Sequence, residues 1–582
     1  MTDAARAVGG GVARAPGAFR RGVWLPGTFL LAVLVATPVL AVAWLAFNPV
    51  ENIWPHLLTT VLPRQLQNTS LLMLGNGIGT LLVGVSSAWL VTMCRFPGRR
   101  IFEWALLLPL AIPGYVVAYV YTDLLEFAGP VQRLLRGVFG WESARDYWFP
   151  EVRSLGGAIA VMSLVLYPYV YLLARAAFLE QSVCVLEASR TLGRSAWRSF
   201  FGVALPLARP AIVVGVVLGL METLNDFGTV DYFAVNTLTV GVFNVWLHMG
   251  NAGGAAQISL VMLAAVFGLM AIERAARRRR RFHHTSARYR PLPGYQLAGA
   301  RRFAAVAVCA LPILMGFVVP AAVLARNAAL SLTESWTPAF LVLALNSLAL
   351  AAAAAAATVL LAVFLAYALR LRGGLALRLA ARVASVGYAI PGAVLAVGVL
   401  IPLARFDNTV DAFMRQAFGV STGLLLSGTV FALVFAYVVR FLAISFGAME
   451  ASLAKVKPSM DMAARTLGMS PVRTLWRVHL PLMRGSMLAA ATIVFVDTMK
   501  ELPATLILRP FGFDTLATHV YQFASDELLR EASLAALAIV AAGIVPVILL
   551  SRVIAGARPG RSGVVAEGGF ADYLSGRSEA EA

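Results

Sequence analysis

Long apolar stretches alternate along the chain with short polar and basic segments. Twelve of these stretches are long enough to cross a bilayer as helices, because about 20 apolar residues span its hydrocarbon core. The pattern therefore predicts about twelve transmembrane helices, six in each half of the chain. They lie at about 23–47, 68–93, 101–125, 154–178, 210–234 and 257–273 in the first half, and at about 303–325, 344–369, 378–404, 421–445, 485–508 and 530–553 in the second.

The composition agrees with this fold class, which is all-α and integral to a membrane. Hydrophobic residues make up 59% of the 582 residues and charged residues only 13%, whereas soluble domains carry about 25% charged residues. The net charge of +19 does not indicate nucleic-acid binding, because most lysines and arginines lie between the apolar stretches. The three cysteines are far apart in sequence, so neither a disulfide framework nor a zinc site is indicated.

Basic residues gather in every second segment between the predicted helices. In membrane proteins such segments lie on the cytoplasmic side, which places both termini there. Residues 1–22 are predicted to be a cytoplasmic tail, 274–302 a basic cytoplasmic linker, and 554–582 a disordered cytoplasmic tail. The stretch 23–47 is longer than the roughly 7–15-residue core of a signal peptide, so we expect an uncleaved first helix.

The two halves of the chain repeat each other. Residues 23–273 and 303–553 are predicted to be two tandem six-helix repeats. Each repeat has an even number of spans, so the two share one orientation and are related by an axis along the membrane normal, and binding sites tend to lie between such repeats. The sequence AIPG at 111–114 recurs at 389–392, RTLG at 190–193 recurs at 465–468, and LP at 205–206 recurs at 480–481.

Two repeat-related segments, 187–206 and 461–481, each predict a helix, a turn and a second helix. Gly193 and Gly468 suit the left-handed residue that ends a helix. Ser195 and Ser470 follow at positions that cap the next helix. Small residues in the first helix permit close approach by another backbone, which is typical of a docking element on the cytoplasmic surface.

These segments resemble the EAA loop of permeases in binding-protein-dependent ABC importers, in which Gly and a later Leu-Pro follow Glu-Ala-Ala at fixed spacing. The Gly and Leu-Pro spacing matches in both halves. The resemblance implies a type I importer fold and two loops that dock on ATPase subunits. Met462 stands where the pattern has Glu, so we expect unequal docking sites; the alternative is a pair of amphipathic helices lying on lipid. The implied docking residues are Glu187, Ala188 and Gly193 in the first half, and Asp461, Met462, Ala463 and Gly468 in the second.

The same resemblance implies the partners and the location of the chain. The partners are two ATP-binding cassette subunits, a periplasmic substrate-binding protein and membrane lipid, and the location is the bacterial inner membrane. No Walker A sequence, GxxxxGK(S/T), occurs in the chain. ATP hydrolysis is therefore expected on a separate subunit, and we expect neither a cofactor nor an enzyme activity in this chain.

Acidic residues inside predicted helices are costly in a membrane and therefore indicate function. Glu222 and Asp226 in the first half correspond to Asp497 and Glu501 in the second, and each pair is four residues apart on one helix face. Four carboxylates around one path suit a hard cation, which makes them candidates for the substrate pathway. In the alternative interpretation, Lys500 neutralises Asp497 or Glu501, and Asp226 caps the outer end of its span in water.

Three stretches, 221–230, 500–506 and 508–518, are similar to the duplicated permeases of ferric-iron uptake systems. That resemblance implies Fe(III) as the substrate, delivered by the periplasmic protein, with no fixed metal ligands assigned. Related fused permeases carry thiamine or aminophosphonates, which are the alternative substrates. The alternative from another class is an ion-gradient-driven secondary transporter, which needs no docking helix after the fourth span of each half.

Overall fold

The computed structural model describes residues 24–179, 181, 189, 191–192, 196–278 and 295–556. Within these residues, eleven helices are long and apolar enough to cross a membrane, and a bent pair of helices makes a twelfth. The predicted all-α fold with about twelve spans is thereby confirmed. The predicted tail 1–22, most of the linker 274–302 and nearly all of the tail 554–582 lie outside the described residues.

The elements follow the two repeats. The first repeat contains α1 (Trp24–Phe47), α2 (Trp54–Thr60), α3 (Leu62–Met93), β1 (Cys94–Arg95), α4 (Arg99–Ala105), η2 (Leu108–Ala111), α5 (Gly114–Leu125), α6 (Pro130–Phe139), α7 (Leu155–Leu179), α9 (Ala196–Ser199), η3 (Phe200–Ala204), α10 (Leu205–Asn225), α11 (Gly228–Tyr232), α12 (Leu238–Phe243), η4 (Asn244–His248) and α13 (Ala252–Arg278).

The second repeat has the same order of elements. It contains α14 (Ala300–Ile313), η5 (Leu314–Val318), α15 (Val319–Leu330), α16 (Leu332–Ser335), α17 (Pro338–Arg372), α18 (Leu375–Ala384), η6 (Gly387–Ala389), α19 (Gly392–Phe418), α20 (Val430–Ala454), α21 (Pro458–Thr466), α22 (Pro471–Thr474), η7 (Leu475–His479), α23 (Leu480–Met499), α24 (Pro503–Leu508), α25 (Leu516–Ser525) and α26 (Leu529–Gly556). A short strand before it, β2 (Tyr295–Gln296), pairs in parallel with β1.

Both repeats break their third span at the AIPG sequence. Ile112 and Ile390 are extended, with ψ of 127° and 123°, because a residue that precedes proline avoids the helical region. In the first repeat the helices on either side meet at 90°. The predictions of continuous spans at 101–125 and 378–404 were therefore wrong.

Three other predicted boundaries were also wrong. The span predicted at 210–234 ends at Asn225, and the one predicted at 485–508 ends at Met499; in both cases the chain then starts a new short helix. The span predicted at 421–445 is displaced to α20, Val430–Ala454. Residues before α20 do not continue it because carboxylates of α19 hold their backbone N–H groups, as described below.

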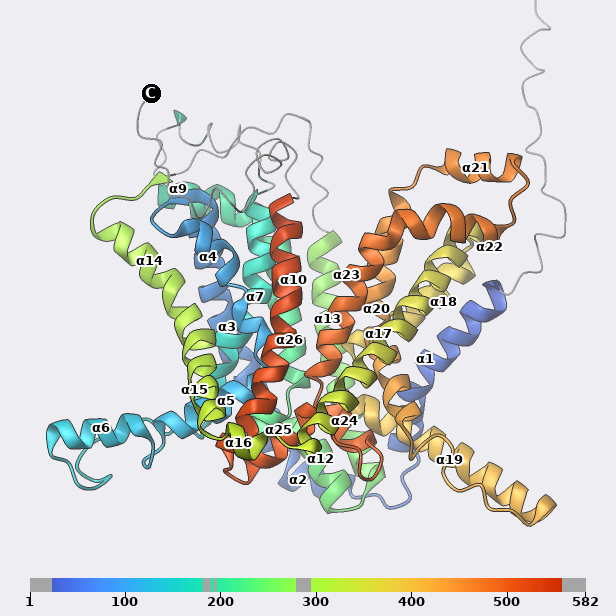
Figure 1. The fold of residues 1–582 in the computed structure, drawn as a ribbon, viewed down its shortest axis with the longest axis horizontal. Helices are drawn as coiled ribbons and strands as arrows, with labels where there is room; N and C mark the ends of the chain where they lie inside the picture. Colours follow the sequence, from blue (N-terminus) through green and yellow to red (C-terminus); the bar gives the residue numbers. More distant parts are fainter. Residues whose placement is uncertain are drawn as a thin grey trace, which may run out of the picture.

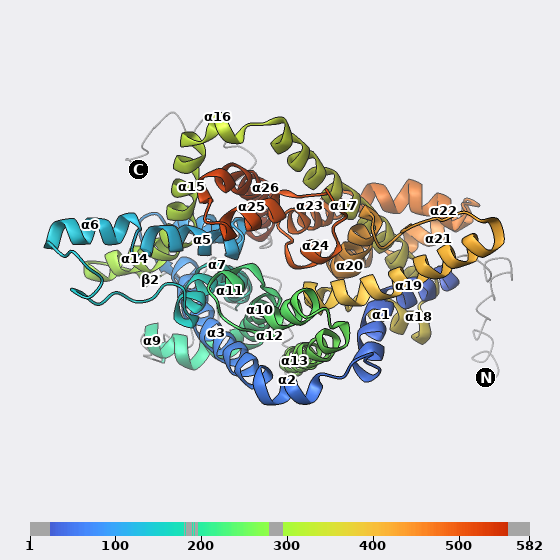
Figure 2. The ribbon, with the colours of Figure 1, turned by 90° about the horizontal axis from the view of Figure 1, so that it is seen from below.

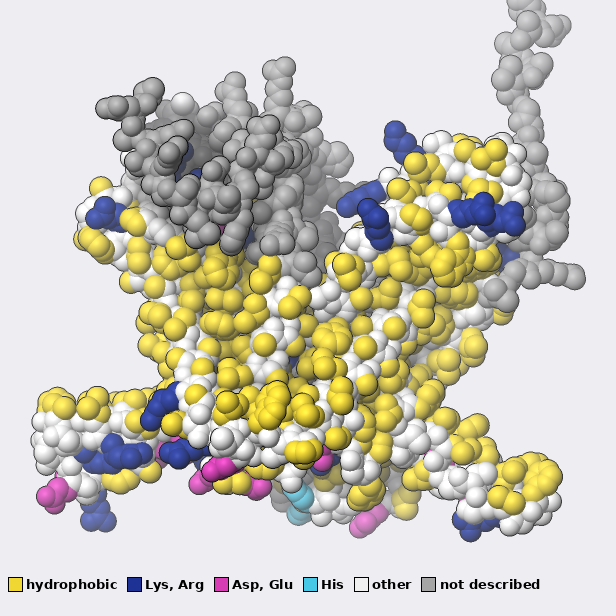
Figure 3. Space-filling view, viewed as in Figure 1, with side chains coloured by type: hydrophobic (Ala, Val, Ile, Leu, Met, Phe, Trp, Pro, Cys, Tyr) yellow, Lys and Arg dark blue, Asp and Glu magenta, His cyan; other side chains and the backbone are white. Residues whose placement is uncertain are grey.

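The two repeats lie side by side and lean apart toward the side of the molecule that carries α21 (Figures 1 and 2). We call this the α21 side, and the opposite side, which carries α6, the α6 side. The surface between them is mostly hydrophobic, whereas charged side chains gather near the two sides (Figure 3). This distribution agrees with a protein that spans a membrane.

The first helix of each repeat packs on the other repeat. Helix α1 contacts α18 and α19, whereas α14, η5 and α15 contact α3, α5, α7 and η2. Glycines permit both close approaches, as is common where membrane helices cross. A Cβ at Gly398 would lie 2.3 Å from the carbonyl oxygen of Pro38, and one at Gly316 would lie 2.7 Å from that of Leu164. The repeats are thus separate in sequence but interlocked in space.

Candidate functional site

A small cavity lies at the centre of the molecule, where the two repeats meet. Its volume is about 120 Å³, and helices of both repeats line it. The helix breaks before α5 and α19 and those after α10 and α23 lie around it. Non-helical backbone is tolerated at membrane depth only where it is buried in protein or lines a cavity. The repeated breaks therefore mark this cavity as a candidate pathway.

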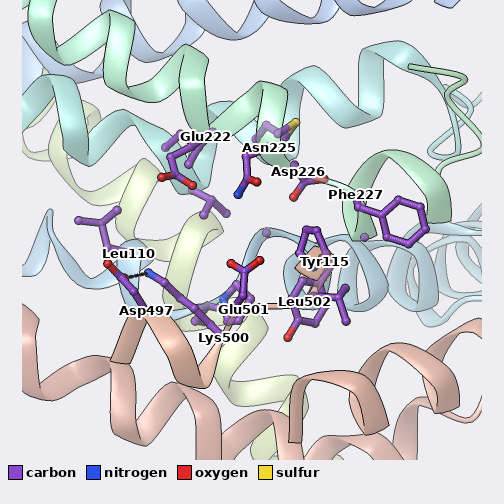
Figure 4. A pocket seen from close by; sticks show the side chains of 18 of the residues that line it. Leu110, Tyr115, Glu222, Asn225, Asp226, Phe227, Asp497, Lys500, Glu501 and Leu502 are labelled. Atoms are coloured by element: carbon purple, nitrogen blue, oxygen red, sulfur yellow. Dashed lines mark ion pairs between the residues drawn. The ribbon is translucent and has the colours of Figure 1, made fainter. Parts of the chain in front are cut away.

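All four carboxylates singled out in the sequence line this cavity. Glu222 and Asp226 lie at the end of α10, and Asp497 and Glu501 lie at the end of α23 and just beyond it. Figure 4 shows the residues of α10 facing those of α23 across the cavity. The duplication thus brings the two acidic pairs together, while their part in transport stays a prediction.

Asp226 and Glu501 are equivalent residues, and each one binds the start of the short helix that follows it. Asp226 accepts hydrogen bonds from the backbone N–H and the hydroxyl of Thr229, both at 2.9 Å. Glu501 accepts from the N–H of Ala504 at 3.3 Å and pairs with Arg440 at 3.1 Å. Asp226 therefore caps the start of α11 from within the cavity lining, whereas the alternative interpretation placed it in water, capping the outer end of its own span.

Glu222 and Asp497 differ in their partners. Asp497 forms an ion pair with Lys500, at 2.9 Å, as the alternative interpretation expected. Glu222 accepts a hydrogen bond of 3.0 Å from the hydroxyl of Tyr388, which in turn contacts Tyr169. Among the described residues, no basic side chain lies within 4.0 Å of Glu222. Glu222 is therefore the cavity carboxylate that has neither a cation nor a backbone N–H as its partner.

Polar contacts join the two repeats at this level. The side-chain oxygen of Asn225, in the first repeat, accepts hydrogen bonds from Arg440 at 3.1 Å and from the backbone N–H of Gly392 at 2.6 Å, both in the second repeat. The bond between Tyr388 and Glu222 also crosses between repeats. Opening a path between the repeats therefore requires that these bonds break.

Further contacts between the repeats lie closer to the α6 side. Tyr521 donates a hydrogen bond of 2.7 Å to Asp231, and Arg153 lies 3.4 Å from Glu527. Together with the bonds around Asn225, they hold the α6 ends of the two repeats against each other. The repeats lean apart at the α21 side (Figure 1). The described conformation therefore has its repeats joined at the α6 side.

Sequence reasoning missed three residues of this cavity: Arg440, Asn225 and Tyr388. Arg440 is an ionisable residue inside an apolar stretch, so the rule that selected the four acids would also have selected it. Tyr388 lies directly before the repeated AIPG sequence, but nothing in the sequence marked its hydroxyl as a partner of Glu222. Within the described residues, no group of three or more His, Cys, Asp or Glu side chains is placed to hold a metal ion.

The second of the two predicted docking loops, residues 461–481, has the helix, turn and helix that the sequence predicted. Gly468 has φ of +70°, which confirms the left-handed end of α21. Ser470 accepts a hydrogen bond from the N–H of Arg473 and so caps α22, with Pro471 in the first helical position. The equivalent residues Glu187, Ala188, Gly193 and Ser195 of the first loop lie outside the described residues.

Asp461 faces the body of the protein and not the open surface of the loop. Its carboxylate accepts hydrogen bonds from Arg370, at 2.7 and 3.0 Å, and lies 2.8 Å from the ring nitrogen of His479. Met462 is 59% exposed, and Ala463 is also exposed. The surface that α21 offers to a partner is therefore apolar at the position where the EAA pattern has Glu.

Comparison with known proteins decides the family. The profile of the family described as "Binding-protein-dependent transport system inner membrane component" matches residues 80–282 and again residues 358–557. The chain belongs to this family. It is a multi-pass inner-membrane permease of the type I ABC importer class, and the double match confirms its duplication. The family contains membrane components of transport systems, so the alternative of a secondary transporter is set aside.

Individual relatives of this permease differ in their substrates. The Fe(3+)-transport system permease protein FbpB 2 of Haemophilus influenzae is 26% identical over 493 residues, which cover 84% of this chain and 89% of that protein. The molybdenum transport system permease protein ModB of Escherichia coli is 30% identical over 201 residues, 33% of this chain and 84% of that protein. The sulfate transport system permease protein CysT of Escherichia coli is 31% identical over 187 residues, 31% of this chain and 64% of that protein.

Proposed function

We propose that this permease imports Fe(III), which a periplasmic binding protein delivers to the α6 side. The single observation that best supports this substrate is the charge of the central cavity. Four carboxylates line it, against two basic side chains, Arg440 and Lys500. With all six groups ionised, the lining carries a net charge of −2, which favours a cation.

The same charge disfavours the oxyanions that two of the relatives transport. A cavity whose lining has a net negative charge repels a dianion in the low-dielectric interior of a membrane protein. The FbpB 2 similarity covers both repeats, which supports iron over molybdate or sulfate.

The size of the cavity favours an ion over thiamine. A volume of about 120 Å³ holds a few water molecules or a partly dehydrated ion, whereas pockets for larger organic ligands measure roughly 300–1,000 Å³. Glu222 is the carboxylate that we expect to contact a passing cation, because no basic side chain of the described residues lies within 4.0 Å of it. Tyr388 adds a second hard oxygen next to it.

Coupling to ATP is proposed to run through the two loops that follow the fourth span of each repeat. Two separate ATPase subunits would dock on them at the α21 side, which we take to be cytoplasmic, together with both termini. ATP binding draws the loops together, and the α6 ends of the repeats separate as their cross-repeat bonds break. Such coupling requires two states that both ends of the protein can bias.

Uptake of radiolabelled Fe(III) by cells with and without this gene tests the substrate. We expect the deletion to abolish uptake, and unlabelled thiamine, an aminophosphonate and molybdate each to leave uptake in the parent cells unchanged. Unchanged iron uptake in the deletion strain, with every other iron importer also removed, would refute iron as the substrate. Competition by one of the three alternatives would identify that compound's class.

A matched pair of variants tests the pathway. Glu222→Gln keeps the shape of the side chain but removes its charge, and we expect Fe(III) uptake to fall by about tenfold or more, since a lost charge-assisted contact costs about 1.5–3 kcal/mol. Glu334→Gln is the control, because Glu334 is exposed in α16, away from the cavity. Equal uptake by the two variants, at equal amounts of protein in the membrane, would contradict a role for Glu222.

A further inference from the structure

Two arms project from the helical bundle at the α6 side. Arm 1 consists of α6 and the segment 140–153 that returns from it. Arm 2 consists of residues 403–429, which include the end of α19 and the segment that returns to α20. The arms extend in opposite directions, and both lie across the direction of the spanning helices (Figures 1 and 2). Neither arm is needed to line the central cavity.

Arm 1 has an apolar helix face that is largely exposed in the described part of the chain. Val131, Leu134, Leu135 and Val138 recur at the three- and four-residue spacing of a helix face. Leu134 is 68% exposed and Val138 is 69% exposed. Leu134 and Val138 would each gain about 1.5–3 kcal/mol if they were fully transferred from water to an apolar environment. The face therefore favours an apolar cover.

The polar residues of arm 1 face the other way and hold the arm together. Gln132 donates a hydrogen bond of 2.7 Å to the carbonyl of Leu125. Arg136 donates one of 2.9 Å to the carbonyl of Phe127, and its guanidinium also lies over the ring of Phe127. Trp141 stacks on Tyr147 in the returning segment. These contacts fix the orientation of α6 and leave its apolar face exposed.

Arm 2 has the equivalent arrangement in the second repeat, and both arm helices end at a left-handed glycine, Gly140 and Gly419. Phe406 and Phe413 lie on one face of α19 and are 52% and 62% exposed. On another face, Asp407 accepts hydrogen bonds from the backbone N–H groups of residues 426 and 427, and Asp411 accepts from those of 422 and 423. The two carboxylates thus bind the returning segment to the helix and keep the phenylalanines on the outside.

We propose that both arms lie in the lipid headgroup region at the α6 side, with their apolar faces among the acyl chains. In Figure 3 the hydrophobic atoms of arm 1 are on the face that looks toward the α21 side and continue into the hydrophobic surface of the spanning helices, while its charged side chains lie below. An amphipathic helix with this orientation lies in a membrane interface. Trp148, 86% exposed in arm 1, is the residue type that gathers there.

Lipid fits both arms better than a protein partner does. The arms lie at equivalent positions of the two repeats, with VQRLLRGVFG at 131–140 and VDAFMRQAFG at 410–419, and they point in opposite directions, so one protein would have to contact opposite sides of the bundle at once. Lipid surrounds the bundle and accommodates any apolar face at the right depth. Two arms at this level would resist tilting of the permease while its repeats rock against each other. This proposal does not depend on the identity of the transported substrate.

Nitroxide labels on single introduced cysteines test the proposal in the full chain, reconstituted in lipid nanodiscs after its three native cysteines are replaced by alanine. Val138→Cys and Phe413→Cys place labels on the apolar faces. Gly137→Cys and Asn408→Cys are matched controls on the other faces, and a Cβ at Gly137 meets no atom within 4 Å. Collision of each label with oxygen, which partitions into lipid, and with a water-soluble nickel complex gives its depth.

We expect the apolar-face labels to have a several-fold higher ratio of oxygen to nickel collisions than the controls of the same arm. A ratio equal to that of the controls would place the arms in water and overturn the proposal. Protection of the apolar-face labels from both reagents would mean that protein covers them, which also overturns it. Leu134→Cys and Ala417→Cys, on the same two faces, replace any variant that does not yield folded protein.

Discussion

Removal of Arg440 tests whether the cavity is stabilised by charge compensation between and within the repeats. Arg440 and Glu501 are buried, with side chains only 5% and 6% exposed. Arg440→Met keeps most of the volume but leaves Glu501 as a buried charge without a cation. Breaking a buried ion pair from one side costs about 3–5 kcal/mol, whereas replacing both partners by neutral residues of similar volume is often nearly neutral.

The expected shift in melting temperature follows from the size of the chain. An unfolding entropy of roughly 2.1 cal/mol/K per residue over 582 residues gives about 1.2 kcal/mol per degree. A loss of 3–5 kcal/mol therefore lowers Tm by about 2.5–4 °C. The shift is larger if helices persist in the detergent-unfolded state, because the unfolding entropy is then smaller.

Thermal unfolding in detergent, followed by tryptophan fluorescence, measures this for Arg440→Met, Glu501→Gln and the double variant. We expect each single variant to lose about 3–5 kcal/mol of stability. The double variant should lose less than either single variant. Its remaining loss should come mainly from the hydrogen bond between Arg440 and Asn225, which is worth about 1 kcal/mol. Arg378→Met, an exposed arginine of α18, should not shift Tm. A double variant whose loss equals the sum of the single losses would refute the reasoning.

Two further predictions concern the second predicted docking loop and the interlocked helices. Asp461→Asn weakens the bonds that hold α21 to Arg370, at a cost of about 1.5–3 kcal/mol. Amide hydrogen exchange should therefore become faster in residues 458–466 and stay unchanged in α3. Equal exchange in α21 of the parent protein and the variant would show that Asp461 does not anchor this helix. Gly398→Ala places a Cβ 2.3 Å from a backbone oxygen of α1 and should cost about 1–3 kcal/mol by overpacking, seen as a lower Tm. Gly219→Ala, whose Cβ meets no atom within 4 Å, should not lower Tm, and similar losses for the two alanine variants would contradict the interlocked packing.

The residue pattern of the second predicted docking loop gave its backbone correctly because the signal is local. The spacing of Gly468, Ser470 and Pro471 specifies a helix end, a cap and a helix start within a few residues, and the structure has all three. The direction of Asp461 was not predictable in this way. Its partners Arg370 and His479 come from two other helices, so their proximity depends on the packing of the whole repeat.

The boundaries of the spans also separate what local sequence predicts from what tertiary contacts decide. Hydropathy located every span, because a helix in lipid must be apolar over about 20 residues. It did not locate the ends of α10 and α23, where an acidic side chain binds the N–H groups of the following helix. Nor did it separate arm 2 from α20, since residues 421–429 contain a run of three leucines and no charge, and Asp407 and Asp411 keep them out of the helix.

The sequence by itself determined the membrane class, the number of spans, the duplication, the geometry of the second predicted docking loop and the acidic pairs, because each depends on local hydropathy, local sterics or direct repetition. Only the tertiary structure decided which carboxylate lacks a cation, which arginine joins the repeats, and that the first helix of each repeat packs on the other. Those features depend on contacts between residues more than 150 positions apart, such as Glu222 with Tyr388. The composition of the chain carries no record of such pairings.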